Sequence, residues 1–260
     1  MDKYIVTSFD DKYWNDWGTS WVASLLELAK FKHKVLIINM GDLSYGAQTR
    51  LKSLNFTIIP SVHKFKNPPL DRFATLSNYC RNNPGHYAYW EADVYFQTDV
   101  DEVFEGDRLT CCANHDDLGK TKQFNTGFIS APHHIWNIFG TFLEFAADFG
   151  NISDQNILNT FIHCFDKLVT VGKDKWNCTT LTNLQWNNGF YLQDELVNVV
   201  HPAGPLKYMV DGREYLFSGK YKSLYEDWYT WLIKGNNMSA RSILKKTGKH
   251  LLCKKKNDLI

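Results

Sequence analysis

Apolar and polar positions in the N-terminal part of the chain alternate between short β-favouring runs and stretches with helical spacing. Apolar and β-branched residues fill Tyr4–Ser8, Val35–Asn39 and Phe56–Pro60, which is typical of buried strands. Between these runs, apolar residues recur every three or four positions in Trp14–Lys32 and in Leu43–Asn55. This alternation of strand and helix predicts a parallel sheet whose crossover connections are right-handed.

The pattern continues and then becomes mixed. The sequence predicts a loop at 61–69, a helix at Leu70–Asn82 and a fourth strand at His86–Trp90. Later strands are expected at Leu109–Ala113, Phe124–Ser130, Val169–Val171 and Val197–His201. Later helices are expected at Trp136–Phe149, Asp154–Phe165 and Lys222–Lys234. Together these elements predict an α/β fold in which helices flank a mostly parallel, mixed sheet.

Composition narrows the class of protein. A chain of 260 residues is long enough for one large domain with a substantial core. The net charge of +1 gives no overall field that would favour nucleic acid as a partner. The six cysteines form no C-x-x-C pair, and no apolar run approaches the roughly 20 residues of a spanning helix. We therefore expect a cytoplasmic protein with free thiols.

The C-terminal segment has two interpretations. Aromatic residues recur at helical spacing in Tyr221–Leu232, and six lysines follow within Lys245–Lys256. In one interpretation the aromatic residues belong to a core and the lysines are solvated. In the other, the two features form a basic and aromatic anchor for peripheral contact with an anionic membrane. The sequence leaves both open.

Three carboxylates stand at the end of the predicted fourth strand and just beyond it. Glu91 and Asp93 follow the aromatic run directly, and Asp99 comes later. A carboxylate at the end of a buried strand is costly unless a positive group lies beside it. Ligands collect at the carboxyl ends of strands in open α/β sheets, and carboxylate oxygens suit Mg²⁺ or Mn²⁺. The alternative is an acidic turn that only closes the strand.

Four stretches occur in an order and spacing that together are distinctive. They are Tyr89–Asp93 (YWEAD), Phe124–Phe128 (FNTGF), Asp154–Asn159 (DQNILN) and His201–Lys207 (HPAGPLK). In this order they resemble the motifs of GT-A-fold glycosyltransferases. The closest resemblance is to glycosyltransferase family 8, which contains glycogenin and bacterial lipopolysaccharide galactosyltransferases. The resemblance covers about residues 4–210. It implies a GT-A-like, Rossmann-like domain at 1–215, followed by a short C-terminal helix and basic tail at 216–260.

The resemblance also implies a metal site. Glu91 and Asp93 match the acidic pair that binds the cation, and His201 matches its third ligand as a neutral imidazole. Asp99 and Asp101 then match the acidic turn that opens a helix. Glu91 departs from the family pattern, in which the first acidic residue is aspartate.

Further matches imply the donor site. Asp10, Asp11 and Tyr13 resemble the base-binding motif for uracil, although Asp11 could instead cap a helix. Gly204 and Lys207 match positions that approach the phosphate, but Tyr208-Met209 replaces the usual Pro-Trp.

The sugar pocket is implied by a second group of matches. Arg72 lies near the family's basic residue for phosphate and sugar, with Arg81 as the competing choice. Asn125 and Gly127 match positions that line the sugar pocket. Asp154 and Gln155 match the pair at the reacting face of the sugar.

The resemblance implies a metal-dependent transferase of the retaining class. It would use Mn²⁺ or Mg²⁺ to move a hexose from a nucleotide diphosphate sugar, UDP-linked, to a hydroxyl of a glycan, protein or lipid. One alternative is a haloacid dehalogenase-type phosphatase, because Asp99–Val103 fits D-x-D-x-V. A second alternative is a catalytically degenerate sugar-binding domain.

Overall fold

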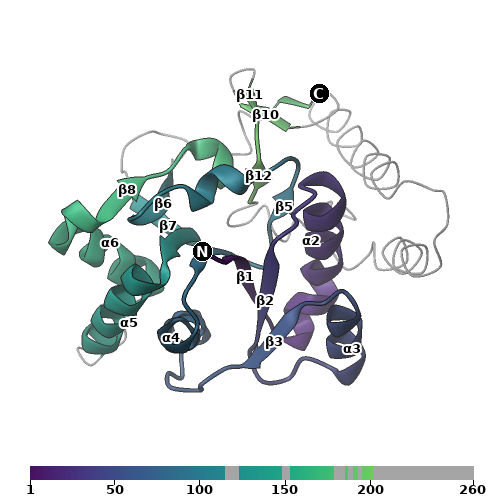
Figure 1. Cartoon of the computed structure of the whole chain (residues 1–260), viewed down its shortest axis with the longest axis horizontal. Coiled ribbons are helices and arrows are strands. Elements are labelled where there is room, and N and C mark those ends of the chain that lie inside the picture. The colour runs from purple at the N-terminus through teal and green to yellow at the C-terminus, as the bar shows by residue number, and fades with distance from the viewer. Residues whose placement is uncertain (115–122, 148–152, 179–184, 187–189, 193–194, 202–260) are drawn as a thin grey trace, which may run out of the picture. The chain divides into compact units, whose positions relative to one another are not determined.

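The computed structural model describes residues 1–114, 123–147, 153–178, 185–186, 190–192 and 195–201. Figure 1 shows the helices and strands of these residues in chain order by colour. By its internal contacts the chain divides into two compact units. The first unit comprises residues 1–11, 33–91 and 101–174, and the second comprises 12–32, 92–100 and the chain from 175 onward. The predicted boundary at residue 215 lies outside the described residues and stays a prediction.

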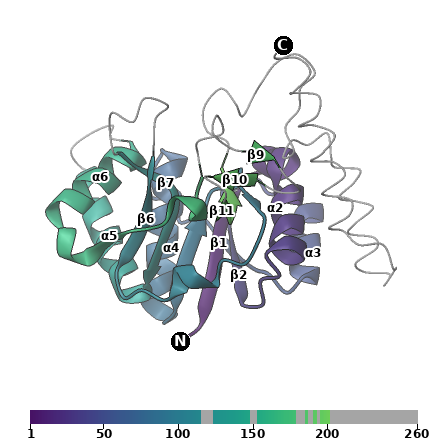
Figure 2. The same cartoon turned by 90° about the horizontal axis from the view of Figure 1, so that it is seen from above.

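A seven-stranded sheet with the order β3-β2-β1-β4-β7-β6-β8 forms the centre of the first unit (Figure 2). Strands β1 to β4 are mutually parallel where they pair, and β7 runs antiparallel to both β4 and β6. This confirms the predicted mostly parallel, mixed sheet. The strands are β1 (Lys3–Phe9), β2 (Lys34–Asn39), β3 (Thr57–Pro60), β4 (His86–Trp90), β6 (Leu109–Asn114), β7 (Gln123–Pro132) and β8 (Val169–Val171).

The longer helices of the first unit begin at residues suited to that position. Ser44 and Ser153 each cap a helix, because their hydroxyls accept from the backbone N–H groups of Ala47 and Asn156. The helices are α3 (Tyr45–Ser53), α4 (Pro68–Asn82), α5 (His133–Ala147) and α6 (Asp154–Cys164), with short 3₁₀ turns at Asp101–Phe104, Asp166–Leu168 and Asp174–Trp176.

Aromatic rings fill the core between the sheet and its helices. All five residues of β4 are buried, and Phe73 of α4 packs edge-on against Tyr89 with the ring centroids 5.1 Å apart. Trp136 of α5 is fully buried, and its Nε1 donates to the carbonyl of Tyr87 at 3.0 Å. Strand β4 is therefore held rigidly along its whole length, which fixes the position of whatever follows it.

Helices α4 and α5 approach each other closely at one point. A Cβ on Gly140 of α5 would overlap the side chain of Ser77 on α4. Glycine is therefore required there for the contact between the two helices. Since α4 carries Arg72, this contact also helps to set the position of that side chain.

A buried carboxylate orders the loop between β3 and α4. Asp71 accepts hydrogen bonds from the Ser61 hydroxyl and from the backbone N–H groups of His63, Lys64 and Phe65. The loop predicted at 61–69 is present, but it ends at Asn67, because α4 begins at Pro68 and proline suits the first turn of a helix.

The second unit contains a helical stretch interrupted by π-helical turns. It consists of α1 (Asp11–Tyr13), whose first residue belongs to the first unit, followed by η1 (Trp14–Gly18), α2 (Thr19–Ala23) and η2 (Ser24–Leu28), of which η1 and η2 are π-helical. The sequence predicts a helix through Lys32, but this helix ends at Leu28. Lys30 adopts a φ of 52°, a left-handed conformation that cannot continue a helix.

Short antiparallel pairs complete the second unit. Strand β5 (Tyr95–Phe96) pairs with β12 (Val199–Val200), and β9, β10 and β11 form a three-stranded sheet. Strand β12 is shorter than the predicted Val197–His201. The three strands of the small sheet are β9 (Gln185–Trp186), β10 (Phe190–Leu192) and β11 (Glu195–Leu196). The helix predicted at Lys222–Lys234 lies outside the described residues. Within the described residues, every helix falls short of the length and hydropathy needed to span a membrane.

Candidate functional site

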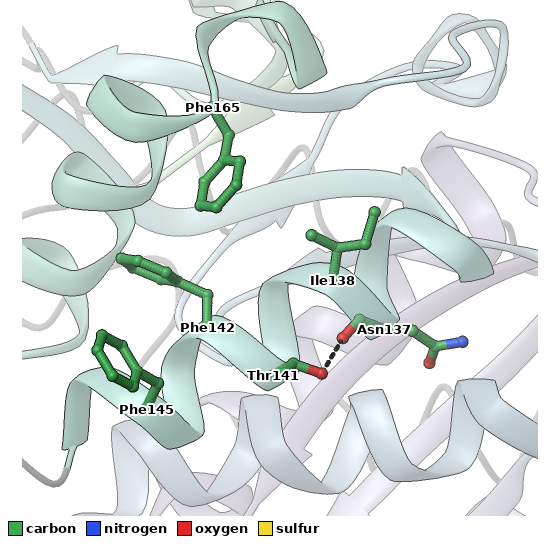
Figure 3. Close-up of a pocket in the computed structure, with 6 residues that line it drawn as sticks. All are labelled: Asn137, Ile138, Thr141, Phe142, Phe145 and Phe165. Carbon is green, nitrogen blue, oxygen red and sulfur yellow. Dashed lines mark hydrogen bonds between the residues drawn. The ribbon is translucent and has the colours of Figure 1, made fainter.

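An apolar surface pocket of about 550 Å³ lies on α5 of the first unit (Figure 3). It is lined by Asn137, Ile138, Thr141, Phe142, Phe145 and Phe165. None of these side chains is ionisable, and Thr141 uses its hydroxyl to donate to the carbonyl of Asn137. This pocket therefore lacks the groups that would bind a diphosphate or move a proton.

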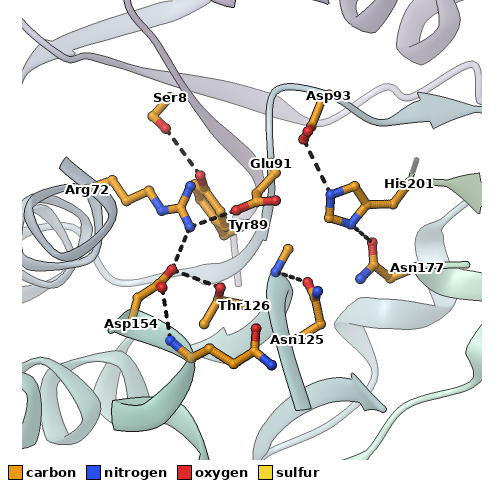
Figure 4. A network of polar contacts seen from close by, with 12 residues as sticks. Ser8, Arg72, Tyr89, Glu91, Asp93, Asn125, Thr126, Asp154, Asn177 and His201 are labelled. Atoms are coloured by element: carbon orange, nitrogen blue, oxygen red, sulfur yellow. Dashed lines mark hydrogen bonds and ion pairs between the residues drawn. The ribbon is translucent and has the colours of Figure 1, made fainter. Parts of the chain in front are cut away.

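A cluster of ionisable side chains in the first unit lies instead at the carboxyl end of β4 (Figure 4). Tyr89 is fully buried near that end, and its hydroxyl lies 3.1 Å from the Ser8 hydroxyl on β1. Burial raises the pKa of Tyr89 to about 12, against the opposing charge of Arg72. The phenol is therefore neutral at physiological pH. Glu91 follows, and its backbone N–H donates to the carbonyl of Gly127 at 3.0 Å, which extends the pairing with β7.

Arg72 of α4 links two carboxylates at this position. Its Nη2 donates to Glu91 Oε1 at 2.8 Å and to Asp154 Oδ2 at 2.9 Å. The guanidinium lies over the rings of Phe73 and Tyr89, at 4.8 and 5.1 Å from their centroids. Burial lowers the pKa of Arg72, but the electrostatic effect of Tyr89, Glu91 and Asp154 raises it more, so the net shift is upward. Arg72 is thus a permanent cation between two acidic groups.

Asp154 receives further hydrogen bonds at the start of α6. The Thr126 hydroxyl on β7 donates to Asp154 Oδ2 at 2.8 Å, and the backbone N–H of Gln155 donates to Oδ1 at 2.9 Å. On the neighbouring turn, Asn125 Oδ1 accepts from the N–H of Gly127 at 2.5 Å. Six predicted site residues therefore belong to this part of the first unit, namely Arg72, Glu91, Asn125, Gly127, Asp154 and Gln155.

Reciprocal hydrogen bonds join two of the four distinctive stretches. Asn159 of α6 accepts from the backbone N–H of Phe124 at 3.0 Å and donates to the carbonyl of Phe124 at 3.1 Å. The last residue of the DQNILN stretch thus fixes the first residue of FNTGF. This connection determines how Asp154 and Thr126 face each other.

A second polar cluster lies in the second unit. Asp93 and His201 are almost fully buried, at 1% and 3% exposure, and His201 Nε2 lies 3.4 Å from Asp93 Oδ1. On the other side of the ring, His201 Nδ1 lies 3.1 Å from Asn177 Oδ1 (Figure 4). An amide oxygen only accepts, so Nδ1 carries a hydrogen.

This tautomer has a chemical consequence. With its hydrogen on Nδ1, a neutral His201 directs the lone pair of Nε2 at a carboxylate oxygen. A metal ion placed between these two acceptors would be bound by both of them. A carboxylate beside an imidazole whose other nitrogen is held by an amide is a common arrangement for binding divalent cations. The residues present therefore fit the implied metal.

The residues predicted to bind the base have structural contacts of their own. Asp11 is the first residue of α1, and its Oδ1 accepts from the backbone N–H of Ser44 at 3.2 Å. The N–H of Asp11 donates to Asp42 Oδ1 at 3.3 Å. Asp10 lies between the last residue of β1 and Asp11. Tyr13 lies in the second unit, and Lys12 Nζ is 5.3 Å from its ring centroid. Their role in base binding stays a prediction.

The two arginine candidates differ in their surroundings. Arg81 lies 3.6 Å from Glu144, and its side chain is 47% exposed, whereas that of Arg72 is 11% exposed. Arg81 therefore fits an ordinary surface charge, while Arg72 joins the acidic groups after β4. Gly204 and Lys207 lie outside the described residues.

The competing acidic pair has contacts unlike those of a phosphatase nucleophile. Asp101 opens the 3₁₀ turn Asp101–Phe104, as predicted, and lies 3.5 Å from His33 Nε2. The backbone carbonyl of Asp99 accepts from Asn198 Nδ2. Both follow β5, which among the described strands pairs with β12 and lies outside the seven-stranded sheet. Ligands of α/β folds bind where the parallel strands of the main sheet end, so this placement disfavours the phosphatase alternative.

Sequence reasoning missed Thr126 and Asn177. Thr126 lies inside the FNTGF stretch, so its position between Asn125 and Gly127 was a usable signal. Asn177 carries no such signal, because it contacts His201 only through the folding of distant segments.

No profile of a known protein family matches the chain, and no curated protein matches it by sequence. Solved structures of glycosyltransferases share its fold. The apo form of GlyE from Streptococcus pneumoniae TIGR4 aligns with a TM-score of 0.58 and 15% identity over 96% of this chain. This alignment spans 64% of GlyE.

Two further structures align over less of this chain but over more of their own. The galactosyltransferase LgtC, in complex with donor and acceptor sugar analogues, aligns with a TM-score of 0.55 and 16% identity over 78% of this chain and 87% of LgtC. Mouse xyloside xylosyltransferase 1 aligns with a TM-score of 0.54 and 15% identity over 78% of this chain and 98% of that protein. The chain thus has the GT-A-like fold that these glycosyltransferases share.

Proposed function

We propose that this protein is a metal-dependent glycosyltransferase of the family 8 type, which moves a hexose from a UDP-sugar to an acceptor hydroxyl with retention at the anomeric carbon. The shared fold supports this, and so does the set of ionisable groups after β4. The observation that carries the proposal is Arg72, a buried cation held between Glu91 and Asp154 at the carboxyl end of β4. In α/β folds, ligands bind at such strand ends.

Asp154 and Gln155 act at the reacting sugar in this proposal. Positive charge develops on the sugar ring as the bond to the diphosphate breaks, and a fixed carboxylate stabilises that charge. Asp154 accepts a hydrogen bond from Arg72, and Gln155 follows it in the first turn of α6. Asn125 and Gly127, whose turn is closed by their own hydrogen bond, line the sugar pocket.

Arg72 contributes to donor binding through its charge. A guanidinium donates along several directions, so Arg72 can contact a phosphate or a sugar hydroxyl while it keeps a carboxylate partner. Gly204 and Lys207 supply backbone approach and a second positive charge to the diphosphate. Asp10, Asp11 and Tyr13 bind the uracil base by a carboxylate hydrogen bond and ring stacking.

Glu91, Asp93 and His201 hold Mn²⁺ or Mg²⁺ in this proposal. They offer two carboxylates and an imidazole, a set that suits a divalent cation. When bound, such a cation neutralises the charge that develops on the departing diphosphate. Asn177 keeps Nε2 of His201 as the ligand atom by accepting the hydrogen on Nδ1. Cytoplasmic location and peripheral membrane contact through the C-terminal segment are expectations that the described residues do not test.

A screen of nucleotide sugars tests the proposal. The purified chain is incubated with UDP-, GDP- and ADP-hexoses, with and without Mn²⁺, and the release of nucleotide diphosphate is measured. We expect release from at least one UDP-hexose, and only when Mn²⁺ is present. Turnover of GDP-hexoses alone would overturn the assignment of uridine. Binding without turnover of any donor would favour the degenerate sugar-binding domain.

A further inference from the structure

Thr126 makes a contact that the function proposed above does not explain. Its side chain is 5% exposed, and its hydroxyl donates to Asp154 Oδ2 at 2.8 Å. The Thr126 hydroxyl is the donor in this hydrogen bond, because a carboxylate oxygen accepts. Threonine is also stiff about χ1, since both a methyl and a hydroxyl group branch from its Cβ. The hydroxyl is therefore a fixed donor on a fixed strand.

The contacts of Asp154 divide unequally between its two oxygens. Oδ2 accepts from both Arg72 Nη2 and the Thr126 hydroxyl, whereas Oδ1 accepts from the N–H of Gln155. Each carboxylate oxygen has two lone pairs. Contacts among the described residues thus use both lone pairs of Oδ2, whereas they use one of the two lone pairs of Oδ1.

Arg72 alone would not fix this division. Its Nη2 also donates to Glu91, so it can follow either carboxylate when a donor or cation changes the charge around it. Thr126 differs because it is neutral, lies on β7 and has no carboxylate partner other than Asp154 among the described contacts. The two hydrogen bonds between Phe124 and Asn159 hold β7 and α6 in a fixed position relative to each other at this point.

We propose that Thr126 is a positioning residue for the transfer reaction. Its hydroxyl holds Oδ2 of Asp154 on the side of Thr126 and Arg72, so that Oδ1 is the oxygen presented to a hydroxyl of the donor sugar. This inference rests on the glycosyltransferase function proposed above. It concerns the sugar and not the nucleotide, since the groups proposed for the base and the phosphates do not include Thr126.

Three variants test this role. Thr126→Val keeps the branched shape and removes the hydroxyl. Thr126→Ser keeps the hydroxyl and removes the methyl group, and Thr126→Ala removes both the hydroxyl and the methyl group. For each, kcat and KM for the UDP-hexose are measured with Mn²⁺, together with the affinity for UDP alone and the melting temperature. We expect Thr126→Val and Thr126→Ala to lose roughly tenfold to a hundredfold in kcat, the effect of losing one hydrogen bond to a charged group.

The same account predicts that UDP affinity stays within about twofold in all three variants and that Thr126→Ser retains kcat within about threefold of wild type. A Thr126→Val protein with wild-type kcat would overturn the inference. So would a Thr126→Ser protein as slow as Thr126→Val, because threonine would then act through its methyl group. If wild type itself turns over no UDP-hexose, the proposed function fails and this inference fails with it. An active wild type beside an equally active Thr126→Val overturns the inference alone.

Discussion

The two polar clusters differ in the group that lies beside their buried carboxylates. In the first unit, Arg72 is a built-in cation that compensates Glu91 and Asp154. In the second unit, Asp93 faces an imidazole nitrogen whose partner nitrogen is already committed to Asn177. The first cluster supplies its own positive charge. The second brings together a carboxylate and an imidazole that fit a divalent metal ion.

This difference separates two tasks that the proposed reaction requires. Groups that contact a neutral sugar need fixed geometry, and permanent ion pairs provide it without help from a ligand. Groups that contact a departing diphosphate need positive charge, which an exchangeable cation supplies on binding. The account therefore predicts that variants in the two clusters differ in their dependence on Mn²⁺.

The largest effect is expected in the second unit. Asp93→Ala removes a buried carboxylate of the proposed metal site and should abolish Mn²⁺-dependent release of UDP. Asp101→Ala is the control, because its carboxylate opens a 3₁₀ turn and its loss should cost only about 1 kcal/mol of stability. Donor turnover and urea unfolding measure the two effects. Inactivity of a folded Asp101→Ala beside an active Asp93→Ala would mean that the wrong acidic pair has been chosen.

The built-in cation of the first unit can be removed directly. Arg72→Met leaves two buried carboxylates without their positive partner, which should cost about 3–5 kcal/mol in the free energy of unfolding. Arg81→Met is the matched control on the same helix, and its exposed charge should contribute within about 0.5 kcal/mol. Urea denaturation with and without Mn²⁺ measures both. Equal losses of stability in Arg72→Met and Arg81→Met would contradict the role of Arg72 as the buried cation of the first cluster.

Gln155 tests the role of the first unit at the reacting sugar. Gln155→Ala should keep UDP affinity unchanged and lose roughly tenfold to a thousandfold in kcat, because the contact is made mainly in the transition state. Steady-state kinetics and calorimetry with UDP check this. Weaker UDP binding with an unchanged kcat would remove Gln155 from the reacting centre. An anomeric proton coupling that shows inversion in the product would contradict the proposed retention.

The smallest effect is expected at Asn177. Asn177→Ala frees Nδ1 of His201 and lets the ring change tautomer, so Mn²⁺ affinity should fall by roughly tenfold to a hundredfold. The variant should regain wild-type kcat when Mn²⁺ is raised to saturation. A kcat that stays low at saturating Mn²⁺ would show that Asn177 acts on more than the cation.

The sequence predicts the sheet well, for a local reason. Strands such as Val35–Asn39 and His86–Trp90 are continuous apolar runs, and the helices between them follow a clear period, so each element can be recognised from its own residues. The π-helical turns at Trp14–Gly18 and Ser24–Leu28 could not be recognised, because they keep helical spacing while the hydrogen-bond pattern changes.

The candidate site is predictable in its members but not in its pairings. The motifs name Glu91, Asp154 and Arg72, yet nothing in their spacing says that one guanidinium joins both carboxylates. The contact of Thr126 with Asp154 joins residues 28 positions apart, and that of Asn177 with His201 joins residues 24 apart. Such pairings depend on how β7, α6 and the segment before β12 fold together, which no local pattern encodes.

Calorimetric titration of Mn²⁺ into wild type, Asp93→Asn and Asp154→Asn tests the contrast between the clusters most directly. The account predicts that Mn²⁺ binds wild type and Asp154→Asn with the same affinity within about threefold, and that Asp93→Asn loses at least about a hundredfold. Equal loss of Mn²⁺ affinity in Asp154→Asn and Asp93→Asn, or unchanged binding in Asp93→Asn, would contradict it.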